Sequence, residues 1–364
     1  MKRVGIVQLG FGTVGGAALE QIARGQSQWR ESLGIDVSVE AVMGRSGATL
    51  ADGGKGFTPA ELESLVSRRR RGESFVTTVP PNEVLSELAS GLPVIVMDAS
   101  AGVGATNLLI DALDSGGGVV LSNKAPLALP SSDSRTAALW SQAGPTGRLR
   151  YEATCGAGLP IISTLRALLD SGDEVLGITG TVSGTFGAIF SAVGAGVPFS
   201  KAVGEAKAQG YTEPDPRDDL SGLDVARKGL ILARTMGESI DVDDIVVHSL
   251  VPADLQDVSI EEFLARLPDY DQAIGRQAAE ALALDTSLKY LMDWEAGRGI
   301  TVGLRQVPRS TVLGALQGPE NIVSFRTRRY DRYPCVVSGP GAGDAVTAAG
   351  MIGDMLALAL RLAA

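Results

Sequence analysis

The chain has 364 residues, of which 45% are hydrophobic and 46 are glycines, and this allows about two compact domains with a sizeable core. The formal net charge is 32 − 42 = −10, and no basic stripe occurs apart from Arg68–Arg71, so we expect no nucleic-acid partner. We expect a soluble cytoplasmic protein without a membrane span. The two cysteines have neither metal nor disulfide spacing, no signal peptide is seen, and no apolar run reaches about 18 residues.

The N-terminus predicts a strand over Val4–Leu9 and a helix over Ala17–Arg24, with a glycine-rich turn between them. The turn has the pattern Gly-x-Gly-x-x-Gly, which binds the pyrophosphate of a dinucleotide when it joins a strand to a helix. The first glycine permits the turn, the second admits the phosphates, and the third lets the helix pack closely. The candidate cofactor-binding residues here are Gly10, Phe11, Gly12, Thr13, Val14 and Gly15.

A second strand is expected over Val37–Met43 and ends in Gly44-Arg45-Ser46. An NAD site usually has an acidic residue here to hold the ribose 2′-hydroxyl. The guanidinium of Arg45 suits a 2′-phosphate instead, which favours NADP. The alternative is that Arg45 is an ordinary surface arginine and that the cofactor is NAD.

Two further strands are expected over Pro93–Asp98 and Gly118–Lys124. Ligands of open parallel sheets lie at the carboxyl ends of the strands, where Ser100, Asn123 and Lys124 fall. Lys124 is therefore a candidate site residue, and the alternative is a solvated surface lysine.

The next strand is expected over Leu149–Thr154, and the loop Cys155–Pro160 joins it to a helix over Ile161–Leu169. This loop could present backbone carbonyls and amides to a ligand or ion. A second glycine-rich start, Ser183–Gly187, could hold a carboxylate at a helix N-terminus. The alternative is that both glycine loops only permit tight packing.

The stretch Gly210–Lys228 concentrates acidic residues before a lysine. We expect a loop over 210–221 and a helix from Leu223, capped by Ser221. Asp224 and Lys228 then share one helix face, and they follow Glu213, Asp218 and Asp219. Such a cluster could hold an ammonium-bearing small molecule while the lysine moves a proton. The alternative is a solvated acidic loop with an ordinary ion pair.

The only histidine, His248, lies in the strand-like run Ile245–Leu250, which favours a structural role and leaves acid–base work to Lys, Asp or Glu. The last third alternates strands and then ends in an apolar helix over Ala345–Leu362.

These elements predict a Rossmann-type doubly wound parallel sheet and a second α+β catalytic and dimerisation domain. The expected division is a dinucleotide-binding domain over 1–148, a substrate-binding and dimerisation domain over 149–338, and a C-terminal helix over 339–364 that returns to the first domain.

In combination and order, these motifs resemble homoserine dehydrogenase along the full chain. The matching stretches are Gly10–Gly15, Val119–Ala125, Tyr151–Ile162, Gly184–Phe186, Gly210–Lys228 and Gly341–Gly350. The resemblance is to the short form, without the C-terminal regulatory domain or fused aspartokinase of some relatives. It implies reversible, NAD(P)-dependent interconversion of L-homoserine and L-aspartate 4-semialdehyde in the threonine and methionine pathway, and a homodimer.

The same resemblance implies roles for particular residues. Lys228 would be the acid–base residue, and Lys124 would lie between cofactor and substrate. Glu213 and Asp224 would contact the substrate, with Asp219 in support. Gly12, Val14, Ser100 and Gly343 would line the cofactor. A sodium ion would be held by Glu152 and by the backbone carbonyls of Cys155, Ala157 and Leu159.

Two other classes stay open at this point. One is an aldehyde dehydrogenase with Cys155 as nucleophile, a chemistry that usually needs a histidine partner. The other is a non-catalytic NADPH-sensing protein, which would need neither the acidic stretch nor both lysines.

Overall fold

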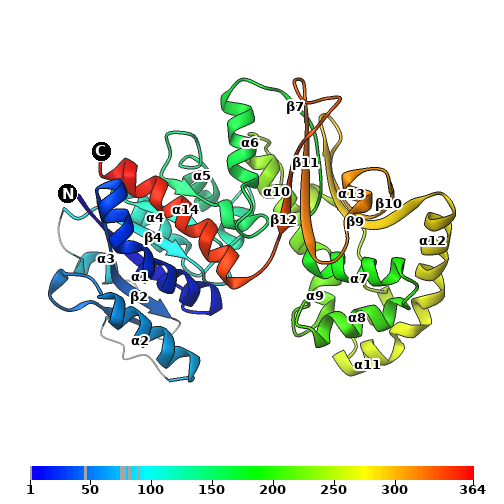
Figure 1. Cartoon of the computed structure of the whole chain (residues 1–364), viewed down its shortest axis with the longest axis horizontal. Coiled ribbons are helices and arrows are strands. Elements are labelled where there is room, and N and C mark those ends of the chain that lie inside the picture. Colours follow the sequence, from blue (N-terminus) through cyan, green and yellow to red (C-terminus); the bar gives the residue numbers. More distant parts are fainter. Residues whose placement is uncertain (1, 45–46, 74–78, 81–82, 89–90) are drawn as a thin grey trace. The chain divides into compact units, whose positions relative to one another are not determined.

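The computed structural model describes residues 2–44, 47–73, 79–80, 83–88 and 91–364 (Figure 1). Its chain forms two compact units. The first comprises Met1–Pro160 together with Gly343–Ala364, and the second comprises Ile161–Ala342.

The first unit is built on a six-stranded sheet in the order β3-β2-β1-β4-β5-β6. Its strands are β1 (Lys2–Leu9), β2 (Ile35–Gly44), β3 (Gly47–Leu50), β4 (Val94–Asp98), β5 (Gly118–Leu121) and β6 (Leu149–Arg150). All neighbours pair in parallel except β2 and β3, which are antiparallel. Helices between parallel strands give the Rossmann-type fold that the sequence predicts.

The helices of this unit are α1 (Thr13–Leu33), α2 (Pro59–Arg70), α3 (Val84–Glu87), α4 (Thr106–Asp114), α5 (Ser134–Trp140) and α14 (Asp344–Leu362). α1 buries Ala18, Leu19 and Ile22 against the sheet, and it ends where Gly34 takes a left-handed conformation with φ of 69°. A capping box starts α2, because Thr58 accepts a hydrogen bond from the Glu61 amide and the Glu61 carboxylate accepts one from the Thr58 amide.

The C-terminal helix α14 returns to the first unit and lies beside α1 (Figure 1, red and blue). Met351, Met355 and Leu358 are fully buried in the same core as Leu19 and Ile22. α14 is long and apolar enough to cross a membrane by length and composition alone, a test that the core helix of a soluble protein also passes. The buried face of α14 explains this apolarity as that of a core helix.

The two units divide at Pro160/Ile161 rather than at 148/149. Leu149 and Arg150 pair with Val119 and Val120 at the edge of the first sheet, which holds this segment in the first unit. The strand expected over 149–154 is also shorter, because the chain turns into a 3-10 helix at Glu152–Thr154.

A second six-stranded sheet, in the order β12-β11-β7-β9-β10-β8, forms the base of the second unit. Its strands are β7 (Val175–Thr181), β8 (Val246–Val247), β9 (Thr286–Glu295), β10 (Gly299–Pro308), β11 (Glu320–Thr327) and β12 (Cys335–Pro340). Neighbours are antiparallel except β8 and β10. The helices are α6 (Ile161–Asp170), α7 (Gly184–Gly194), α8 (Phe199–Ala208), α9 (Pro216–Leu220), α10 (Leu223–Thr235), α11 (Ile260–Arg266), α12 (Asp271–Ala283) and α13 (Val312–Ala315). α7 and α10 pack on this sheet.

The acidic stretch differs locally from expectation, because α9 occupies part of the predicted loop. Asp215 caps α9 by accepting from the Arg217 amide, and Pro216 takes the first helical position, where its missing N–H costs nothing. Ser221 is not the N-cap residue of α10, although its hydroxyl accepts a hydrogen bond from the Leu223 amide at 3.3 Å. The residue before that helix is Gly222, whose φ of 77° is a left-handed conformation that glycine adopts without strain.

Candidate active site

In the glycine-rich turn after β1, Gly10 and Gly15 are tightly packed, whereas Gly12 adjoins open space. A Cβ on Gly10 would lie 2.4 Å from the Ser100 amide nitrogen, and one on Gly15 would lie 2.0 Å from the Gly10 carbonyl oxygen. A Cβ on Gly12 would meet no atom within 4 Å. Among the residues that the structure describes, no side chain caps the N-terminus of α1, and this end of the helix fits the phosphates of a dinucleotide. In this turn Phe11 is buried and Thr13 is exposed.

The buried carboxylate of Asp98, which the sequence analysis did not select, joins the ends of β4 and β5. Its Oδ1 accepts from the Ser100 amide at 2.8 Å, and its Oδ2 accepts from the Asn123 side-chain amide at 3.1 Å. The Asn123 side chain in turn accepts from the Ala125 amide at 3.1 Å, on the far side of Lys124. Burial raises the pKa of Asp98, although these hydrogen bonds oppose the rise.

Lys124 is therefore held in a short turn at the carboxyl edge of the first sheet, after β5 ends at Leu121 rather than at Lys124 itself. Gly343 precedes α14 in the same unit, with φ of 124°. Arg45 lies outside the described residues.

The loop after β6 holds the four residues that the family resemblance connects with a sodium ion. All four, Glu152, Cys155, Ala157 and Leu159, are buried. Ala157 has φ of 57°, a left-handed conformation that is uncommon outside glycine. The helix α14 supports the loop closely, since a Cβ on Gly350 would lie 3.0 Å from the Ala157 carbonyl oxygen.

A second carboxyl group, Asp354 of α14, faces this loop and was not selected from the sequence. Its Oδ2 accepts from the Glu152 amide at 2.8 Å. Burial raises the pKa of Asp354 to about 7; the bond from the Glu152 amide opposes the rise, and the Glu152 charge adds to it. Two carboxyl groups in a buried setting favour a nearby cation, so these residues fit an ion bound by oxygen atoms.

In the second unit, Lys228 and Asp224 lie one turn apart on α10. Lys228 Nζ is 2.8 Å from Asp224 Oδ2 and donates to the Val182 carbonyl oxygen at 2.5 Å. The lysine is 8% exposed, whereas the Asp224 side chain is 43% exposed. The buried ammonium group of Lys228 is thus paired with a carboxylate, that of Asp224, which is exposed to solvent.

Asp219 fastens the acidic stretch to the start of α7. Its Oδ2 accepts from the Glu213 amide at 2.8 Å, and its Oδ1 lies 2.9 Å from Thr185 Oγ1. The Thr185 hydroxyl is also 2.6 Å from the Tyr211 carbonyl oxygen. Burial raises the pKa of Asp219, the bonds from Glu213 and Thr185 oppose this, and the nearby charges of Asp224 and Asp218 add to it. Glu213 itself is exposed, and its backbone amide is held by Asp219.

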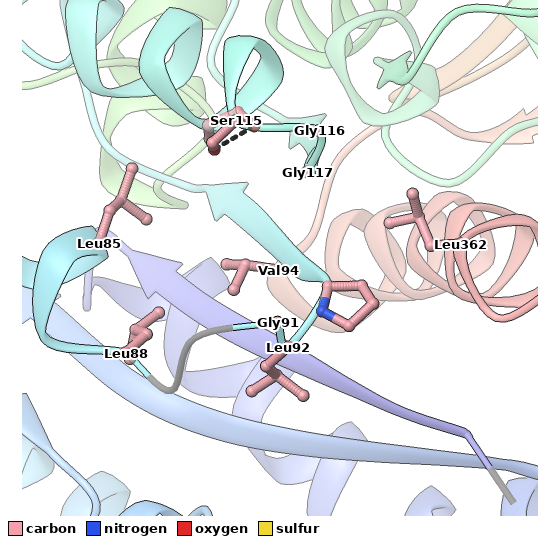
Figure 2. A pocket seen from close by; sticks show the side chains of 11 residues that line it. Leu85, Leu88, Gly91, Leu92, Val94, Ser115, Gly116, Gly117 and Leu362 are labelled. Atoms are coloured by element: carbon pink, nitrogen blue, oxygen red, sulfur yellow. Dashed lines mark hydrogen bonds between the residues drawn. The ribbon is translucent and has the colours of Figure 1, made fainter.

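One cavity of about 440 Å³ lies in the first unit (Figure 2). Leu85, Leu88, Leu92, Val94 and Leu362 line it. It adjoins the start of β4, whereas Asp98 and Ser100 lie at the carboxyl end of that strand. This cavity is therefore separate from the edge of the sheet that would bind a dinucleotide.

Comparisons with known proteins match this arrangement over nearly the whole chain. The profile of the family "Homoserine dehydrogenase" matches residues 160–356, and that of "Homoserine dehydrogenase, NAD binding domain" matches residues 10–147. The bifunctional aspartokinase/homoserine dehydrogenase 2 of Zea mays is 39% identical over 99% of this chain, but the chain spans only 39% of that relative. The homoserine dehydrogenase of Saccharomyces cerevisiae is 36% identical over 99% of both chains.

A solved structure of a hyperthermophilic archaeal homoserine dehydrogenase in complex with NADPH is also similar. Its TM-score is 0.74 at 25% identity, over 99% of this chain and 98% of that chain. The fold and the matched sequence define a dehydrogenase with a nicotinamide-cofactor domain. The chain belongs to the homoserine dehydrogenase family, as its sequence motifs predict.

Neither of the two other classes left open by the sequence gains support. Cys155 is fully buried, and Thr154 Oγ1 lies 3.8 Å from its sulfur. A nucleophilic thiolate needs an accessible, activating setting. His248 is exposed in the second unit, next to the backbone pairing between β8 and β10.

Proposed function

We propose that the chain interconverts L-homoserine and L-aspartate 4-semialdehyde with a nicotinamide cofactor. The observation that carries the proposal is Lys228, a buried ammonium group beside Asp224 and next to an acidic segment, in a chain of this family. An amino acid with an aldehyde or alcohol needs a site for its ammonium group and a proton donor or acceptor for its oxygen.

The residues divide this work by their chemistry. The exposed carboxylate of Glu213 attracts the substrate ammonium, and Asp219 holds the Glu213 backbone in place. Lys228 gives a proton to the aldehyde oxygen in reduction and takes the hydroxyl proton in oxidation, with Asp224 orienting its ammonium. Lys124, held by the Asn123 turn, supports this proton transfer. When bound, the nicotinamide cofactor supplies or accepts the hydride.

For the cofactor, we propose NADP before NAD. Gly10, Phe11, Gly12, Thr13, Val14 and Gly15, with Ser100 and Gly343, would hold the dinucleotide, and the space at Gly12 supports this. The preference for a 2′-phosphate rests on Arg45 in the sequence and on the NADPH in the archaeal relative. We also propose that Glu152 and the carbonyls of Cys155, Ala157 and Leu159 hold a sodium ion.

We further propose a cytoplasmic homodimer that acts in the threonine and methionine pathway. The sequence has two cysteines, without disulfide spacing, and this supports a reducing compartment. Exposed Val336 on the edge strand β12 supports a contact through the second sheet. Light scattering of the purified protein tests the dimer.

The test of the activity is nicotinamide absorbance with L-homoserine and either NADP or NAD. We expect reduction that requires L-homoserine and that is absent in Lys228→Ala. A folded protein that binds NADPH but reduces neither cofactor would contradict the proposal and favour the sensing role. The comparison of cofactors also tests the interpretation of Arg45.

A further inference from the structure

Tyr290 lies next to the acidic stretch Gly210–Lys228 and contacts three parts of the second unit: Phe186, His248 and Gly222. It is on β9 and is 3% exposed. Its ring stacks on Phe186 of α7, with centroids 3.8 Å apart and planes at 17°. Its hydroxyl donates to the His248 carbonyl oxygen at 2.9 Å. Phe186 follows Thr185, the residue that holds Asp219, so the ring supports the same helix start.

The Tyr290 hydroxyl also fills the space that a side chain at position 222 would need. A Cβ on Gly222 would lie 2.1 Å from Tyr290 Oη and 3.1 Å from Tyr290 Cζ. Gly222 is the left-handed residue that joins α9 to α10. Its amide donates to the Asp219 carbonyl oxygen at 2.9 Å, and its carbonyl accepts from the Ala226 amide at 3.0 Å. The turn is thus bonded to both helices while Tyr290 closes it from below.

The hydroxyl is well suited to this place because it stays neutral. Burial raises the pKa of Tyr290 well above its usual value. Its acceptor is fixed in turn, because the His248 amide donates to the Val302 carbonyl oxygen of β10 at 2.8 Å. The position of Oη is therefore determined by the sheet rather than by the acidic segment that it supports.

We propose that Tyr290 is a positioning residue for the reaction, because it fixes the conformation of the turn at Gly222. This turn determines where Asp224 and Lys228 lie relative to Asp219 and Glu213. The inference rests on the proposed function, because it assigns Tyr290 to the acid–base helix of that site. Tyr290 touches no substrate atom in this proposal and acts only through the direction in which α10 leaves the turn.

The test is a double-mutant cycle of Gly222→Ala and Tyr290→Phe. The control is Gly237→Ala, at the other end of α10. Gly237 has φ of +92° and open space at its Cβ, so this variant carries the backbone strain without the clash. We expect Gly222→Ala to lower kcat for L-homoserine on the order of 10²-fold, as a displaced catalytic group does, and Gly237→Ala to lower it far less.

Adding Tyr290→Phe should restore at least about tenfold of that loss, a coupling of about 1.4 kcal/mol, because Phe lacks the clashing oxygen. NADPH affinity should stay within about twofold in all variants, since the dinucleotide turn is in the other unit. If Gly222→Ala does not fold, recovery of folded, active protein in the double variant would also support the proposal.

Two results would overturn it: equal losses in Gly222→Ala and Gly237→Ala, or a double variant no better than Gly222→Ala. Loss of kcat only in proportion to a fall in thermal stability would also do so, because that pattern marks a purely structural role. A wild-type chain without turnover would instead overturn the proposed function, whereas wild-type turnover with additive variants would overturn this inference alone.

Discussion

Lys228 and Asp224 form an ion pair one helical turn apart on α10, and the lysine is the buried partner of the two. Its ammonium has a second acceptor in the Val182 carbonyl oxygen, at the end of β7. An ordinary surface pair of this spacing is worth only about 0.3–0.5 kcal/mol and has two solvated partners. The burial of Lys228 therefore distinguishes this pair from the surface pairs on the same unit and makes it the best candidate for proton transfer.

Replacing Lys228 with alanine should lower kcat by about 10²–10⁴-fold, the usual contribution of a general acid–base residue. The matched control is Lys201→Ala, because Lys201 forms an i,i+4 pair with Glu205 and its side chain is 66% exposed. Steady-state kinetics and NADPH titration of both variants provide the measurement. Similar activity in the two variants would rule out the role of Lys228.

The two glycines Gly12 and Gly15 should respond differently to alanine. At Gly12 the added methyl meets no protein atom, so the variant should fold normally but bind NADPH at least about tenfold more weakly, a loss of about 1.4 kcal/mol. At Gly15 the methyl meets the backbone oxygen of Gly10, so the fold should lose about 1–3 kcal/mol or more. Thermal unfolding and NADPH titration separate the two. Unchanged NADPH binding in Gly12→Ala would contradict the phosphate site.

Thr185→Val should weaken the attachment of the acidic stretch Gly210–Lys228 to α7 without changing the contacts of Lys228. The change removes the hydroxyl contacts to Asp219 and to the Tyr211 carbonyl oxygen, at a cost of about 1–3 kcal/mol for the unsatisfied groups. We expect a higher KM for L-homoserine and unchanged affinity for NADPH. The reverse pattern would show that Thr185 has no part in holding the substrate side.

Asp98 should give the stability a measurable pH dependence. Burial raises its folded pKa above the ordinary 3.8, so between these two values the folded chain binds more protons than the unfolded chain. The free energy of unfolding therefore falls as pH rises through this window. Asp98→Asn removes this contribution, so the difference between wild type and variant should shrink with rising pH. Urea denaturation at a series of pH values tests it, and a constant difference would contradict the assignment.

Cys155→Ala should keep near wild-type turnover. The side chain is fully buried, and in the proposed ion site the residue contributes only its backbone carbonyl. Loss of activity in this variant, with normal thermal unfolding, would revive the thiol mechanism.

Much of the fold and of the candidate site could be predicted from short sequence patterns. The glycine turn after the first strand, the parallel sheet and the shared face of Asp224 and Lys228 all follow from spacing along a few residues. Family membership follows from the same motifs, which is why the comparisons agree with it. Sequence patterns failed where short elements begin and end, as at α9 and the capping of α10, because a single turn has too few residues to show a period.

Tertiary structure alone decided the contacts between side chains far apart in the chain. It placed Asp98 between Ser100 and Asn123, Asp354 under Glu152, Thr185 on Asp219, and Tyr290 beneath Gly222. No periodicity reports such pairs, because the path of the backbone determines which distant residues meet. The amino-acid sequence by itself thus determined the family and predicted the candidate site residues, whereas packing within each unit determined which other residues hold those side chains in place.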